Sequence, residues 1–280
     1  MHTMHFTWQL LGALSLTVLL EAYGAHRMGW KRAATGLRET GVLFALVSLW
    51  LFVSSLAPER ADEAIQRAQW IHHTELRLGL PNEASWQHWI LPHPLLVRAA
   101  NLYYEVMHIA VFCAVLAWII VRHRSFYPWA RTSLVMVTGA CLLIELIPVA
   151  PPRFLSGDGF VDLGAKYHQS IYSTALLKHL LAADSLSAMP SVHVAWAGLA
   201  ALLSVYISRS PWRWLLLLHP LTTFVVVVVT ANHFWADGIV AMLLLTLMYP
   251  ARTVAERLSA RALTKSGAAR KDTSELPRAD

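Results

Sequence analysis

Charged residues are scarce in this chain of 280 residues: Asp, Glu, Lys and Arg make up 14% of it, whereas a typical soluble domain has about 25%. That scarcity excludes a soluble enzyme with an ordinary solvated surface, and a hydrophobic content of 56% excludes a disordered or collagen-like chain. Cysteine is scarce too. Cys113 and Cys141 both lie in apolar runs, which argues against a disulfide framework. An integral membrane protein remains.

Seven apolar stretches have about the 20 residues that a transmembrane helix needs. The run of valines from Val225 to Val229 is continuous, which favours helices over the alternating strands of a membrane barrel. Met1–Phe6 holds no Lys or Arg, so we expect the first stretch to be a retained helix rather than a cleaved signal peptide. We therefore predict an all-α fold, a polytopic transmembrane helical bundle with about seven membrane helices and two long outer loops. The stretches are 6–23, 40–57, 100–121, 131–149, 190–208, 212–231 and 234–250.

Lys and Arg are distributed unevenly between the two ends of the predicted helices. The gaps after the first, third and fifth stretches, together with the tail, hold 16 of the 23 basic residues. By the positive-inside rule these segments are cytoplasmic, so the loops 58–99 and 150–189 face outward. The net charge of +6 is then a topology signal, and we expect no nucleic-acid partner.

We divide the chain into three parts on this basis. Residues 1–99 would hold the N-terminal membrane helices and an outer amphipathic loop, in which Trp70, Trp86 and Trp89 would anchor at the membrane interface. Residues 100–250 would form the catalytic bundle. The tail 251–280 is polar and basic, and we expect it to be cytoplasmic and disordered.

Three polar clusters lie where the topology predicts the outer membrane surface, and ionisable groups there by default mark a functional site. Arg153 follows two prolines after the fourth stretch, and its guanidinium would suit phosphate oxygens or an interfacial lipid. Ser191 and His193 begin the fifth stretch after Pro190, either as an anion-binding helix N-terminus or as plain capping.

The third cluster precedes the last stretch. His233 and Asp237 are four residues apart and lie on one helical face, so the carboxylate can fix the imidazole tautomer and leave the other nitrogen free to attack. A purely structural His–Asp pair at a helix end would show the same spacing. Two His, an Asp, an Arg and a helix N-terminus on one membrane face together indicate phosphoryl chemistry.

These residues resemble the type-2 phosphatidic acid phosphatase superfamily over about 100–250. The Pro-Pro-Arg motif and the stretch Thr230–Phe234 look most like its inositolphosphotransferase branch, which includes fungal inositol phosphorylceramide synthase. Asn101–Glu105 with His108 in the third stretch also looks like that branch.

The resemblance implies a role for each residue. His233 would be the nucleophile that becomes phosphohistidine, Asp237 would orient it, and His193 would protonate the leaving oxygen, while Arg153 and Ser191 would bind phosphate. Two basic positions of the superfamily are occupied here by Leu146 and Val227, so the phosphate cradle has fewer cations. Lys166 or Lys178 would compensate. Neither a cofactor nor a metal is implied.

Polar residues on one face of the third stretch are Asn101, Tyr104, Glu105 and His108. They would line a headgroup pocket or hydrogen-bond to neighbouring helices, and the sequence favours neither. Lys178 in the second outer loop would contact a headgroup or extend to the membrane interface.

The leading hypothesis is a membrane enzyme that transfers a phosphoryl group or phospho-headgroup from a lipid phosphate to an alcohol such as inositol, without a metal. With water as the acceptor it would be a lipid phosphate phosphatase. A metal-dependent enzyme using two His and an Asp is an alternative, and so is a non-catalytic transporter or structural protein.

Overall fold

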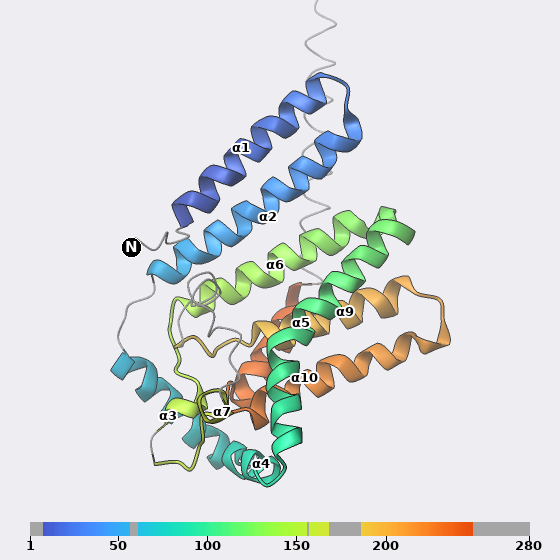
Figure 1. Cartoon of the computed structure of the whole chain (residues 1–280). Helices are drawn as coiled ribbons and strands as arrows, with labels where there is room; N and C mark the ends of the chain where they lie inside the picture. The colour runs from blue at the N-terminus through green and yellow to red at the C-terminus, as the bar shows by residue number, and fades with distance from the viewer. Residues whose placement is uncertain (1–7, 57–60, 156, 168–185, 249–280) are drawn as a thin grey trace, which may run out of the picture.

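The computed structural model describes residues 8–56, 61–155, 157–167 and 186–248, which form an all-α structure (Figure 1). Within these ranges the β-type pairing is limited to an isolated bridge between Val149 and Ser187. The predicted fold class is therefore confirmed. Lys178 and the tail 251–280 lie outside the described residues.

Each of the seven apolar stretches coincides with a helix. By length and composition, three described segments can cross a membrane, namely Lys31–Val53, Pro94–Arg122 and Pro211–Val229. Two further apolar helices are shorter, so the number of seven spans stays a prediction. The helices are α1 (Trp8–Arg27), α2 (Lys31–Leu56), α5 (Pro94–Arg122), α6 (Tyr127–Glu145), α9 (Val192–Ile207), the 3₁₀ helix η4 (Pro211–Leu217) leading into α10 (Leu218–Val229), and a last helix, Trp235–Met248.

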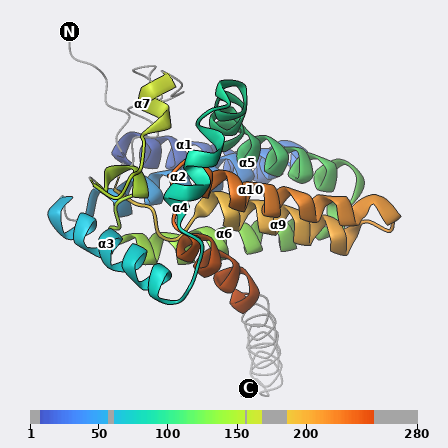
Figure 2. The same ribbon diagram turned by 90° about the horizontal axis from the view of Figure 1, so that it is seen from below.

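Short helices gather at one end of the bundle, as both views show (Figures 1 and 2). The α1–α2, α5–α6 and α9–η4 connections, which are the basic ones, lie at the opposite end. The connections thus alternate between two ends, as the sequence-based topology requires. The short helices are α3 (Ala61–Arg77), α4 (Glu83–Ile90), the 3₁₀ helix η2 (Pro152–Phe154) and α7 (Leu163–Tyr167), while η1 (Arg124–Phe126) joins α5 to α6.

Local sequence signals explain several helix boundaries. Pro94 occupies the first turn of α5, where its missing N–H is not needed. The side chain of Asn82 caps α4 by accepting a hydrogen bond from Ala84 N at 2.9 Å. Gly79 follows the end of α3 with φ of 77°, a conformation that glycine adopts without strain.

Helix α9 packs against α5, α6 and α10, and small residues allow close approach to the last helix. A Cβ atom on Gly198 would lie 2.9 Å from Leu245, and one on Gly238 would lie 2.0 Å from the Phe224 ring. Many large apolar side chains face outward instead, as expected of a surface in contact with lipid. They include Leu16, Leu20, Leu43, Leu143, Leu221 and Leu247.

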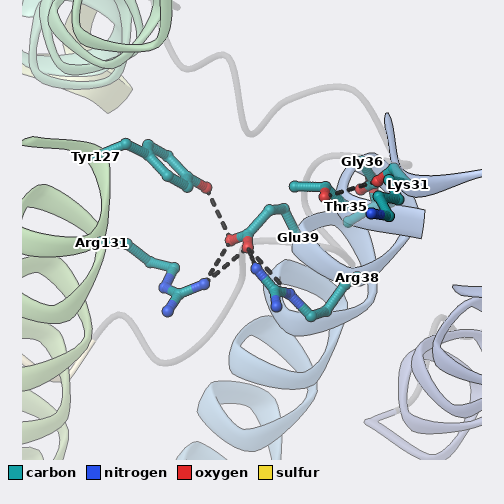
Figure 3. A network of polar contacts seen from close by, with 8 residues as sticks. Lys31, Thr35, Gly36, Arg38, Glu39, Tyr127 and Arg131 are labelled. Atoms are coloured by element: carbon teal, nitrogen blue, oxygen red, sulfur yellow. Dashed lines mark hydrogen bonds and ion pairs between the residues drawn. The ribbon is translucent and has the colours of Figure 1, made fainter. Parts of the chain in front are cut away.

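A polar network attaches the N-terminal hairpin to the rest of the bundle (Figure 3). Arg131 on α6 donates to both carboxylate oxygens of Glu39 on α2, at 2.7 and 2.9 Å. The Tyr127 hydroxyl donates to the same carboxylate at 2.9 Å, and Arg38, the preceding residue on α2, donates to it as well. The charged pair thereby links α2 to α6 near the basic end of the molecule.

Candidate active site

The turn between α10 and the last helix fixes the position of His233. The Thr230 hydroxyl donates to Val226 O at 2.7 Å, and Ala231 has a positive φ of 52°. The backbone N–H groups of Asn232 and His233 both donate to Val227 O at 3.1 Å. The chain therefore reverses tightly after α10, and the His233 ring lies beside the rings of His193 and Tyr104.

The imidazole of His233 is buried, with 5% of the residue exposed, and its Nδ1 atom lies 2.7 Å from the carbonyl oxygen of Ala188. Because a carbonyl can only accept, Nδ1 carries the hydrogen. The same Nδ1 lies 3.3 Å from Asp237 Oδ2. Nε2 therefore holds the lone pair, and it has no hydrogen-bond partner among the described residues.

Asp237 is fully buried and held by backbone groups. Its Oδ2 atom accepts a hydrogen bond from Phe234 N at 2.9 Å, and its carbonyl oxygen accepts one from Ser191 N at 3.2 Å. These bonds join the start of the last helix to the start of α9. They fix the carboxylate beside His233, as the four-residue spacing predicted.

His193 lies next to His233, with 5.6 Å between the two ring centroids. Its ring stacks on Tyr104 at 4.2 Å and contacts His108 at 4.1 Å, both from α5. Both nitrogens of His193 are buried and have no hydrogen-bond partner in the described part of the chain. The structure thus brings Tyr104 and His108 to the two histidines, while His108 Nδ1 also contacts Tyr104 O at 3.1 Å.

Arg153 contacts the same turn through the two residues that precede His233. Its Nη1 donates to Asn232 Oδ1, and its backbone N–H donates to Ala231 O at 3.0 Å. The guanidinium also lies over the Phe154 ring at 4.9 Å. The Arg153 guanidinium, carried by η2, therefore binds the residue that directly precedes His233 in the chain.

Ser191 is the N-cap of α9, and its hydroxyl accepts from Val194 N at 3.4 Å. Asn101 is buried, and its amide nitrogen donates to Leu163 O at 3.4 Å, so it connects α5 to α7. Lys166 is exposed on α7. Of the predicted pocket residues, Tyr104 and His108 contact the histidines, whereas Asn101 and Lys166 have other surroundings.

The two positions where the superfamily has basic residues supply no cation. Val227 is fully buried, and its carbonyl oxygen receives the N–H groups of the His233 turn. Leu146 is 36% exposed just after α6. A charge at Val227 would be buried among apolar side chains, which would be costly.

Sequence reasoning missed a buried cluster on α3 and α4. Glu75 Oε1 accepts a hydrogen bond from Ala236 N at 2.6 Å, directly beside Asp237. Burial, and next the nearby Glu83, raise the pKa of Glu75 to about 9. His72 lies 3.2 Å from Glu83. The i, i+3 spacing of His72 and Glu75 was the available signal.

The family model described as the PAP2 superfamily matches residues 69–251, more than half of the chain. The chain belongs to the PAP2 superfamily. Comparison with curated proteins and with solved structures returned no significant match. Membership in the PAP2 superfamily confirms the resemblance at that level, whereas the inositolphosphotransferase branch stays a prediction. Membership also indicates phosphatase or phosphotransferase chemistry on lipid phosphates in a membrane.

Proposed function

We propose that this protein transfers a phosphoryl group or phospho-headgroup from a lipid phosphate to an alcohol acceptor through a phosphohistidine at His233. The observation that supports this most directly is the state of the imidazole: Nδ1–H faces the Ala188 carbonyl and the Asp237 carboxylate, which leaves Nε2 as a nucleophile. Membership in the PAP2 superfamily supports a lipid phosphate as the substrate.

In the first step, the Nε2 lone pair attacks phosphorus, and the bond from phosphorus to the oxygen of the leaving alcohol breaks. His193, 5.6 Å away between ring centroids, gives that oxygen a proton. Positive charge develops on the His233 ring, and Asp237 stabilises it. In the second step the oxygen of an acceptor hydroxyl attacks phosphorus, the bond from phosphorus to His233 Nε2 breaks, and Nε2 regains its lone pair. His193 takes the proton of the attacking hydroxyl.

Phosphate oxygens would be bound by Arg153 and by the first turn of α9. The Arg153 guanidinium would exchange its hydrogen bond to Asn232 for one to the phosphate. The Ser191 hydroxyl accepts from Val194 N at 3.4 Å, a long hydrogen bond that leaves its own hydrogen available to a phosphate oxygen. Lys166 and Lys178 are the outer-loop cations that would add charge for a polar headgroup. This chemistry requires no metal or other cofactor at the reacting atoms.

We further propose that the site faces the non-cytoplasmic side, because the basic connections lie at the opposite end of the bundle. In sealed spheroplasts or vesicles of known orientation, a cysteine at Ala165, an exposed residue on α7, should react with an impermeant maleimide from outside and one at Ser210 should not. The reverse pattern would overturn this orientation.

The decisive experiment uses purified protein and candidate lipid phosphates labelled with ³²P, with and without an alcohol acceptor such as inositol. Acid-labile, alkali-stable label should appear on the wild-type chain and be absent from His233→Ala. His26→Ala, an exposed histidine on α1, is the matched control and should label normally.

The labelled product separates the two activities. Label in an acceptor ester indicates transfer, whereas inorganic phosphate indicates the alternative, a lipid phosphate phosphatase. Equal turnover by wild-type and His233→Ala protein would refute the phosphohistidine mechanism.

A further inference from the structure

A second cluster of ionisable side chains lies behind the His233 turn, on the two helices of the first outer loop. His72 and Glu75 are three residues apart on α3, and Glu83 is the first residue of α4. All three are buried, with 3%, 3% and 0% of each residue exposed. One nitrogen of His72 and one carboxylate oxygen from each Glu lie within 4.8 Å of one another.

The polar atoms of this cluster lack the partners that buried polar atoms normally have. His72 Nδ1, Glu75 Oε2 and both carboxylate oxygens of Glu83 are buried and form no hydrogen bond of acceptable geometry. Within the described part of the chain, no Lys or Arg forms an ion pair with either carboxylate. The apolar Phe160 ring packs beside the cluster, 5.4 Å from the His72 ring between centroids.

Two neighbouring buried carboxylates need a compensating charge, because an unpaired buried charge is very costly. A dication would neutralise both, and it would use the imidazole nitrogen as its third ligand. In a tetrahedral zinc site with bonds of about 2.1 Å, ligand atoms lie about 3.4 Å apart, which small side-chain rotations reach from the present spacing. Calcium and magnesium prefer sets made of oxygen alone.

We propose that His72, Glu75 and Glu83 bind one divalent transition-metal ion of the Zn²⁺ class. The fourth position would be a water or the second oxygen of a carboxylate. The ion would connect α3 to α4. Since Glu75 Oε1 accepts from Ala236 N at 2.6 Å, the ion would also hold the segment that carries His233 and Asp237. It is a structural site, separate from the reacting atoms.

The test is independent of the proposed function, because neither of its readouts needs a substrate. Full-length protein is produced in zinc-supplemented cells, purified in detergent and analysed by inductively coupled plasma mass spectrometry. We expect about one Zn²⁺ per chain, and removal by a strong chelator should lower the unfolding temperature by roughly 5 °C or more. Adding ZnCl₂ back should restore it.

Variants distinguish a bound metal ion from a shared proton as the positive charge that balances the two carboxylates. Glu83→Gln and Glu75→Gln keep the side-chain shape but remove one negative charge, so both should fold and lose at least tenfold in zinc content. His73→Ala, an exposed neighbour on α3, should keep the wild-type zinc content. If wild-type protein holds less than about a tenth of an equivalent and ZnCl₂ does not change its unfolding temperature, a shared proton balances the cluster and the proposal is wrong.

Discussion

Replacing Asp237 with Asn tests what the carboxylate contributes beyond orientation. The Asn amide oxygen can take the position of Oδ2, where it would still accept the hydrogen bond from Phe234 N and lie about as close to His233 Nδ1 as Oδ2 does. The amide nitrogen would take the position of Oδ1, which has no hydrogen-bond partner among the described residues. We therefore expect the variant to fold normally and to lose only the negative charge.

The magnitude follows from the 3.3 Å between Asp237 Oδ2 and His233 Nδ1. At an effective dielectric constant of about 20, two unit charges at that distance attract by about 5 kcal/mol. The amide oxygen keeps part of this attraction, so the barrier to phosphohistidine formation should rise by about 3–4 kcal/mol, which is a ~10²–10³-fold slower reaction. Loss of about 10⁴-fold is typical where removing the carboxylate also changes the tautomer, but here the Ala188 carbonyl still holds Nδ1–H.

The assay compares kcat/KM for release of the lipid alcohol from a labelled lipid phosphate in detergent micelles, alongside the unfolding temperature. Asp158→Asn, in the second outer loop, is the control for the same chemical change. A rate within about fivefold of wild type would show that no charge develops on His233, since a charge 3.3 Å away must be felt. A loss above ~10⁴-fold in a folded variant would show that Ala188 does not hold the tautomer.

Three further predictions address other parts of the molecule. His193→Ala should slow cleavage of an alkyl phosphate ester at least ~10²-fold but a nitrophenyl ester much less, because a good leaving group needs no proton; equal losses would refute the general acid. Gly238→Ala should lower stability by about 1–3 kcal/mol, since its Cβ would lie 2.0 Å from Phe224, while Gly139→Ala has open space; thermal unfolding checks both. In metal-free protein, the pKa of Glu75 is raised to about 9, so the protonated side chain stabilises the fold at low pH and this contribution is lost as pH rises through 9. The unfolding temperature should therefore fall from pH 5 to 9, and Glu75→Gln should make that decrease smaller.

The sequence predicted the helices and the candidate site residues for the same physical reason. Polar residues such as His193, His233 and Asp237 are conspicuous because they interrupt or border apolar runs, where ionisable groups are expensive. Their spacing placed them at one end of the predicted bundle, and the structure brings the two histidine rings to 5.6 Å. Tyr104, on the helix face predicted either to line a headgroup pocket or to hydrogen-bond to neighbouring helices, stacks on His193.

Backbone contacts could not be predicted in this way. The Ala188 carbonyl that binds His233 and the Ala231 carbonyl that receives Arg153 have no signature in the residue type. The prediction for Lys166 rests on its charge alone, and charge does not reveal that its helix leaves it exposed. The cluster of His72 and Glu75 was overlooked for the opposite reason, because charged residues are ordinary in a polar loop and only tertiary packing buries them.

The position of α3 gives a physical reason for where the family match begins. The match starts at residue 69, well before the third membrane stretch, and the α3 side chains that reach the His233 turn follow that point. The His72 ring lies 6.3 Å from the Phe234 ring, and Glu75 binds Ala236 N. The N-terminal hairpin, in contrast, is attached to α6 through Glu39 near the opposite end. Helix α3 therefore supports the turn that carries His233, and changes in α3 should affect His233 more than changes of equal size in α1.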